Sequence, residues 1–186
     1  MKNVLLISSR VMHYRVSIYN YFFERFRAQD YNFVVRSDEL QKENPYPIKF
    51  DFREVPFGFF RYRREVLALR PLVVILFLHL KGLMIFPLIH WLRWKKIPVI
   101  FWTKGANLDE PDSRLRAMLF HHIHNLSTGI ILYSPQELGL IKEKNRGKVT
   151  FANNTVNYYD YPEITASRDD IKRDFHIPFK KVALFV

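Results

Sequence analysis

The first residues that could do chemistry are basic and follow the apolar run Asn3–Ser8. Arg10, His13 and Arg15 stand where a strand would give way to a helix. Basic side chains at a helix start suit an anion, because the helix amino terminus also favours negative charge. We expect these three residues to contact a phosphate or a sugar hydroxyl of a ligand. The alternative is a surface-exposed basic loop.

A second candidate group follows the apolar run Ile97–Thr103 and consists of Lys104, Gly105 and Asn107. Glycine allows a backbone to approach a ligand closely. Lysine can stabilise negative charge that develops on a leaving phosphate. We therefore expect this segment to line a ligand-binding cleft, and the alternative is a plain turn from strand to loop.

Three histidines near each other raise the question of a metal site. His121 and His124 are three residues apart on an expected helix, and imidazoles are common metal ligands. No convergent carboxylate accompanies them, so we expect no metal. We expect His122 near the apolar stripe of that helix and the other two histidines facing solvent.

The chain has a net charge of +11, and basic and aromatic residues gather between positions 61 and 96. Glu65 is the only acidic residue in that segment. Trp beside Arg and Lys resembles an interfacial anchor, so we expect contact with an anionic membrane surface. The alternative is a solvated basic face around a core helix. This basic-aromatic set comprises Arg61, Arg63, Arg64, Trp91, Arg93, Trp94, Lys95 and Lys96.

The residues that would position these groups alternate between strand and helix patterns. We expect strands at 3–8, 31–36, 49–55, 71–78, 97–103, 129–133, 148–152 and 181–186. We expect helices at 15–29, 61–69, 80–96, 113–126 and 135–144, and a further helix capped by Ser167. Such alternation predicts an α/β fold with a doubly wound, mostly parallel, Rossmann-like sheet and helices on both faces.

Composition excludes several classes of protein. The chain has no cysteine, which removes disulfides and thiolate metal sites and favours the cytoplasm. The opening segment is too short for a signal peptide, and we interpret it as a strand. Neither Gly-x-Gly-x-x-Gly nor a Walker-type loop follows it, which argues against a Rossmann enzyme that binds a nicotinamide cofactor or cradles a phosphate in that loop. No nucleic-acid-binding motif accompanies the positive charge, so we expect no nucleic-acid partner.

The last third of the chain resembles the domain junction of family 4 glycosyltransferases, which have two Rossmann-like domains. Thr128–Ser134 is similar to the family's strand near the end of the first domain, and Val149–Asn157 to its junction motif, with Asn157 in place of the usual aspartate. Arg173–Pro178 and Lys181–Val186 look like the helix and strand that open the second domain. The resemblance implies an amino-terminal domain at 1–157 and the start of a donor-binding domain at 158–186.

The resemblance also implies a function. Family 4 enzymes transfer a sugar from a nucleotide sugar, with UDP or GDP as carrier, and retain the anomeric configuration without a metal for donor binding. We therefore expect a retaining hexosyltransferase of the GT-B type that acts in bacterial surface-polysaccharide or lipopolysaccharide assembly. It would be peripheral on the inner face of the cell membrane, with a glycan or lipid-linked acceptor. This chain alone would be inactive, because most donor contacts belong to the second domain.

On this interpretation Lys104 and His13 are the catalytic candidates, and Lys104 stands where relatives commonly carry a histidine before the glycine. The resemblance places acceptor or phosphate binding at the interdomain cleft, where we expect Arg10, Arg15, Gly105 and Asn107. The alternative function is a basic module that binds a membrane or nucleic acid without catalysis.

Overall fold

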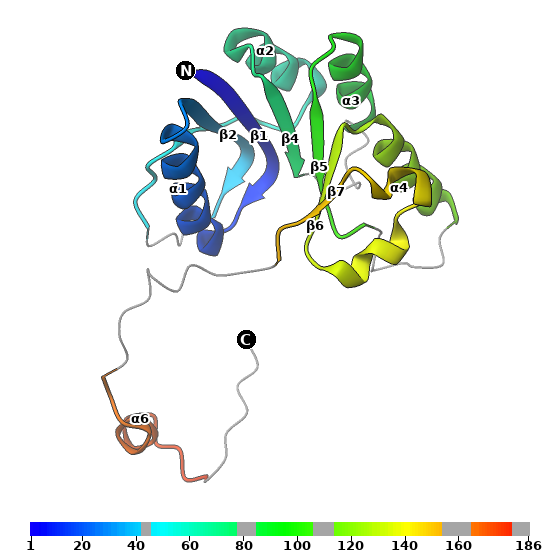
Figure 1. Cartoon of the computed structure of the whole chain (residues 1–186). Coiled ribbons are helices and arrows are strands. Elements are labelled where there is room, and N and C mark those ends of the chain that lie inside the picture. Colours follow the sequence, from blue (N-terminus) through cyan, green and yellow to red (C-terminus); the bar gives the residue numbers. More distant parts are fainter. Residues whose placement is uncertain (42–45, 78–84, 106–113, 154–164, 180–186) are drawn as a thin grey trace. The chain divides into compact units, whose positions relative to one another are not determined.

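The computed structural model describes residues 1–41, 46–77, 85–105, 114–153 and 165–179 (Figure 1). The chain divides into two compact units, Met1–Val156 and Asn157–Val186. Within the second unit only 165–179 are described, so the expected strand at 181–186 and the junction residue Asn157 lie outside the described residues.

The first unit is built on a seven-stranded sheet in which every pair of neighbouring strands is parallel. The spatial order of the strands is β3-β2-β1-β4-β5-β6-β7. The strands are β1 (Lys2–Val11), β2 (Tyr31–Leu40), β3 (Asp51–Glu54), β4 (Val73–Phe77), β5 (Val99–Trp102), β6 (Gly129–Leu132) and β7 (Val149–Phe151).

Helices lie between most consecutive strands, although none is described between β2 and β3. They are α1 (His13–Arg27), α2 (Phe59–Leu69), α3 (Ile85–Trp94), α4 (Arg114–Leu126), the 3-10 helix η1 (Pro135–Leu140) and α5 (Glu143–Arg146), with α6 (Arg168–Asp174) in the second unit. Among the described residues, no helix has both the length and the apolar composition needed to cross a membrane.

Both faces of the sheet are covered, because successive side chains of a strand point to opposite sides. Leu5 and Ile7 of β1 belong to a buried cluster that also holds residues of α2, α3 and α4. Val4 and Leu6 belong to the other cluster, in which Tyr19 of α1 is fully buried. The predicted doubly wound Rossmann-like fold with helices on both faces is therefore confirmed.

Several expected boundaries were wrong for physical reasons. We expected a loop at Ser9–Tyr14, but β1 continues to Val11 because the long strand β2 pairs with it as far as Leu40. The expected helix at 135–144 is the 3-10 helix η1 followed by the short α5, with Ile141 extended between them. The predicted glutamate cap of that segment is present, since Glu137 accepts hydrogen bonds from the backbone N–H groups of Tyr133 and Ser134.

A buried ionic network ties three elements of the first unit together. Arg36 of β2 donates to Glu65 of α2 at 2.8 Å and to the Asp51 carboxylate of β3 at 2.9 Å. Arg53 of β3 also pairs with Glu65. The side chains of Arg36 and Glu65 are each 4% exposed, so neither charge is compensated by water.

The described part of the second unit is a single short helix with its flanking residues. Ser167 caps α6, as expected, because its hydroxyl accepts a hydrogen bond from the backbone N–H of Asp170 at 3.2 Å. Arg173 donates to the Asp170 carboxylate at 2.6 Å and so reinforces the same turn.

Candidate functional site

The strand order places a topological switch point between β1 and β4. The chain runs from β1 through β2 to β3 in one direction and then from β4 to β7 in the other. In open α/β sheets, ligands bind outside the carboxyl ends of the strands at such a point. The residues that follow β1, β4, β5 and β6 are therefore the first place to look for a site.

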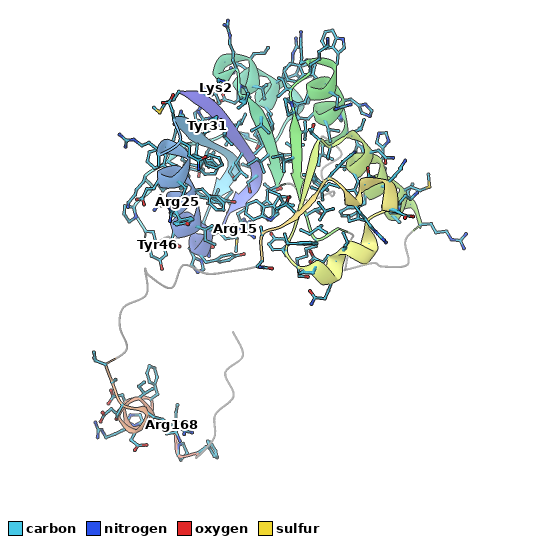
Figure 2. The ribbon with its side chains drawn as sticks, in the orientation of Figure 1. Lys2, Arg15, Arg25, Tyr31, Tyr46 and Arg168 are labelled. Carbon is cyan, nitrogen blue, oxygen red and sulfur yellow. The ribbon has the colours of Figure 1, made fainter. Side chains whose placement is uncertain are left out.

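Arg15 lies at this edge, in the first turn of α1 (Figure 2). Its side chain is surrounded by aromatic rings from the ends of three strands. The guanidinium carbon lies 4.4 Å from the ring centre of Phe77 and 5.5 Å from that of Trp102, and Nη2 donates to the Tyr133 hydroxyl at 2.8 Å. Segments far apart in the sequence thus meet around one cation that is only 7% exposed.

The electrostatics of this group are unusual. Burial works against the charged form of Arg15, but the phenol groups of Tyr19 and Tyr133 outweigh burial and raise its pKa, so the guanidinium stays charged. Burial also raises the pKa of both tyrosines, while the Arg15 charge opposes that rise. Both phenols are therefore neutral, and each keeps an O–H group that can donate.

His13 begins α1 and is half-buried beside Gln41, which follows β2. The Gln41 side-chain oxygen lies 3.2 Å from the backbone nitrogen of His13 and 2.9 Å from Nδ1 of its ring. Because the backbone N–H can only donate, that atom of Gln41 is the acceptor, and Nδ1 must carry a proton as well. In the neutral ring this leaves Nε2 with a lone pair, as a general base requires.

The structure changes the expectation for Arg10. This residue belongs to β1 rather than to a loop, and its guanidinium forms an ion pair with Glu39 of β2 at 2.6 Å. Both side chains are more than half exposed. Glu39 therefore competes with an anion for the charge of Arg10, whereas Arg15 has no acidic partner among the described residues.

The second predicted group follows β5. Lys104 is exposed and makes no ion pair or hydrogen bond within the described part of the chain. Gly105 has a φ of 81°, in the left-handed region that favours glycine, and a side chain there would point at Leu140 and Glu137. Gly105 therefore permits the turn and its packing against η1. Asn107 lies outside the described residues.

The basic-aromatic set lies on α2 and α3 and just beyond them, and these helices pack against each other. Arg63 lies over the Trp91 ring, with its guanidinium carbon 5.8 Å from the ring centre, and the Lys95 ammonium lies 4.2 Å from that of Trp94. Trp94 is 72% exposed. The carboxyl end of α3 lies where the strands begin (Figure 1), at the edge opposite Arg15 (Figure 2).

The histidines of α4 are placed differently from our expectation. His124 is fully buried against Phe101 and Phe120, whereas His122 is exposed and its Nε2 lies 2.9 Å from that of His90. We expected Leu115, Met118, Leu119, Ile123 and Leu126 to form the apolar stripe; Ile123 is buried, but Leu115 and Met118 are each 66% exposed. Burial lowers the pKa of His124 to about 4, so it is neutral at neutral pH. No group of three or more potential metal ligands occurs among the residues described.

Sequence reasoning missed the partners of Arg15, namely Tyr19, Trp102 and Tyr133. Trp102 ends β5 and Tyr133 follows β6, so the sequence signal was a polar aromatic residue at or near the end of two of the expected strands. What the sequence did not supply was the strand order that brings those ends to the start of α1.

Comparisons with known proteins support the fold. The sequence matches no family model and no curated protein. Among solved structures, the UDP-GlcNAc 2-epimerase from Methanocaldococcus jannaschii matches with a TM-score of 0.55 at 12% identity, covering 83% of this chain and 46% of that chain. Apo UGT2 of Phytolacca americana matches with a TM-score of 0.54 at 12% identity, covering 93% and 55%. UGT2 with UDP-2fluoro-glucose and pterostilbene matches at 0.47 and 10% identity, covering 85% and 55%.

These likenesses define the class of fold. The first unit is a Rossmann-like domain of the kind found in GT-B proteins. The chain spans about half the length of the solved structures that it matches, 46% and 55% for the first two.

Proposed function

We propose that the protein is the acceptor-side domain of a glycosyltransferase that takes its sugar from a UDP- or GDP-linked donor. The observation that carries the proposal is the switch point of a GT-B-type sheet. His13 and Arg15 lie in the first turn of α1, which follows β1, and Lys104 follows β5. The fold supports nucleotide-sugar chemistry, because the similar epimerase is named for UDP-GlcNAc.

The finer features of the proposal rest on the family 4 resemblance of the last third of the chain. They are retention at the anomeric carbon, transfer of a hexosyl group, and a role in bacterial surface-polysaccharide or lipopolysaccharide assembly. We also propose a second domain that binds most of the donor, in keeping with a chain that spans about half the length of its structural neighbours.

Two side chains have distinct proposed roles in transfer. Nε2 of His13 accepts a hydrogen bond from the acceptor hydroxyl and orients it for attack, since Gln41 fixes the proton of the same ring on Nδ1. Lys104 stabilises negative charge on the leaving phosphate, since its ammonium has no acidic partner in the described residues. His13 and Lys104 follow β1 and β5, the two neighbours of β4.

Binding of nucleotides and nucleotide sugars, measured by calorimetry, tests the proposed function. We expect UDP- or GDP-sugars to bind when the proposed second domain is attached. If they do not bind, the proposal of a glycosyltransferase is wrong. The basic-aromatic set would then favour a module that binds a membrane or nucleic acid without catalysis.

We further propose that the basic-aromatic set holds the protein on an anionic membrane surface, where a lipid-linked acceptor would be found. Trp94 is exposed, and cationic groups lie over the rings of Trp91 and Trp94, which supports contact of this surface with a membrane. The inner face of the cell membrane is the proposed location.

Liposome sedimentation tests the membrane proposal. Each base near an anionic surface contributes about 1 kcal/mol, so replacing Arg61 and Arg64 with glutamine should weaken binding to anionic liposomes roughly 30-fold at low salt. The matched control replaces Arg25 and Arg27, which are exposed on α1. Equal loss in both variants, or no sedimentation of the unmodified chain, would count against this surface.

A further inference from the structure

We propose that Arg15, Tyr133, Trp102 and Tyr19 form an oxyanion subsite that binds a phosphate or carboxylate group. That the oxyanion belongs to the sugar acceptor rests on the proposed function. The subsite itself rests only on the contacts of these four residues.

Two buried arginines of the first unit differ in whether a carboxylate neutralises them. Arg36 is 3% exposed and is neutralised by Glu65 and Asp51. Arg15 is 7% exposed and has no acidic partner in the described part of the chain. A buried charge is ordinarily paired, because burial removes the water that would stabilise it. The missing counter-charge at Arg15 is the property that an anionic ligand would supply.

Two buried polar groups near Arg15 lack a hydrogen-bond partner. The indole Nε1 of Trp102 and the hydroxyl of Tyr19 are buried and make no hydrogen bond. Trp102 lies beside Arg15, and the Tyr19 hydroxyl is close enough for the Arg15 charge to oppose the rise of its pKa. Arginine and tryptophan side chains only donate. The ligand that satisfies this group must therefore be rich in acceptors.

The shape of the Arg15 guanidinium and the apolar rings around it also favour an oxyanion. A guanidinium is a planar fork that matches two oxygens of a phosphate or carboxylate. Of its donors, Nη2 binds the Tyr133 hydroxyl at 2.8 Å, and the Tyr19 hydroxyl lies close enough to interact with the same group. The rings of Phe77, Trp102 and Tyr133 exclude water around the cation, which strengthens its attraction for an anion. The location at the switch point is where the fold places ligands.

The fluorescence of Trp102 can report directly on this subsite. The chain has three tryptophans, and Trp91 and Trp94 lie on α3 at the opposite edge. In a W91F/W94F background, the remaining emission comes from Trp102. Titration with inorganic phosphate, pyrophosphate and glucuronate, at constant ionic strength set with chloride, should give a saturable change with at least one oxyanion.

Variants assign the change to Arg15. We expect Arg15→Met to abolish binding and Arg15→Lys, which keeps the charge but loses the fork, to weaken it at least 10-fold. Tyr133→Phe should weaken it about 3- to 10-fold through loss of one neutral hydrogen bond. Arg25→Met is the matched control and should bind as the background does, since Arg25 is exposed in the last turn of α1, at the other end of the helix from Arg15. Circular dichroism and thermal melting establish that each variant is folded.

Each outcome bears on the proposal. Tighter binding of phosphate or pyrophosphate indicates a phosphate-bearing ligand, and tighter binding of glucuronate indicates an acidic sugar; either supports the subsite. No saturable change with any oxyanion overturns it, as does equal binding by folded Arg15→Lys or Arg15→Met. Oxyanion binding to this chain, with no nucleotide-sugar binding by the chain that carries the proposed second domain, would refute the proposed function alone, and the reverse would refute the subsite alone.

Discussion

Replacing Glu65 with alanine should lower the free energy of unfolding by about 3–5 kcal/mol, the usual cost of removing one member of a buried ion pair. Glu65 accepts from Arg36 and also pairs with Arg53, so its loss leaves the buried Arg36 with Asp51 alone. Urea denaturation followed by circular dichroism measures the change. The isosteric Glu65→Gln variant separates the loss of charge from the loss of packing.

The matched control for Glu65 is the exposed pair of Arg10 and Glu39. Glu39→Ala should cost less than about 1 kcal/mol, because both side chains are more than half exposed and water screens the pair. If Glu65→Ala cost no more than Glu39→Ala, the buried network would not hold α2 on the sheet as we describe.

Replacing Lys104 with methionine should lower kcat for sugar transfer by about 100- to 1000-fold in the enzyme that carries both domains. The ammonium would act on charge that develops only in the transition state, so the KM for the acceptor should change little. Methionine keeps most of the length and apolar stem of lysine while it removes the charge. Steady-state kinetics with a UDP- or GDP-sugar donor measures both constants.

Two further variants make the Lys104 result specific. Lys104→Arg keeps the positive charge and should retain more activity than Lys104→Met. Lys144→Met removes a charge from an exposed position on α5, away from the end of β5, and should leave kcat unchanged. Normal turnover by Lys104→Met would remove this residue from the catalytic machinery.

The architecture could be predicted from the sequence because its signals are local. Continuous apolar runs such as Asn3–Ser8 indicate strands covered on both faces, and their alternation with helical patterns indicates a parallel sheet. The precise ends were harder to predict, since β1 extends to Val11 through its pairing with β2, a contact between distant segments.

The chemistry of the candidate site could be predicted only in part. The position of Arg15 after the first strand pointed to an anion, but its environment depends on Phe77, Trp102 and Tyr133, which strand order alone brings together. In the sequence, Arg10 and Arg15 looked like equivalent anion-binding residues. Arg10 differs from Arg15 because β2 places Glu39 beside it. On α4, a small error in the phase of the helix exchanged the expected positions of His122 and His124.

Calorimetric titration with UDP, GDP and their sugar conjugates tests the central claim most directly. It would compare this 186-residue chain with the same chain extended by the proposed second domain. We predict binding only to the extended chain, with the preferred nucleotide identifying the donor class. Absence of binding to both would contradict the assignment as a glycosyltransferase.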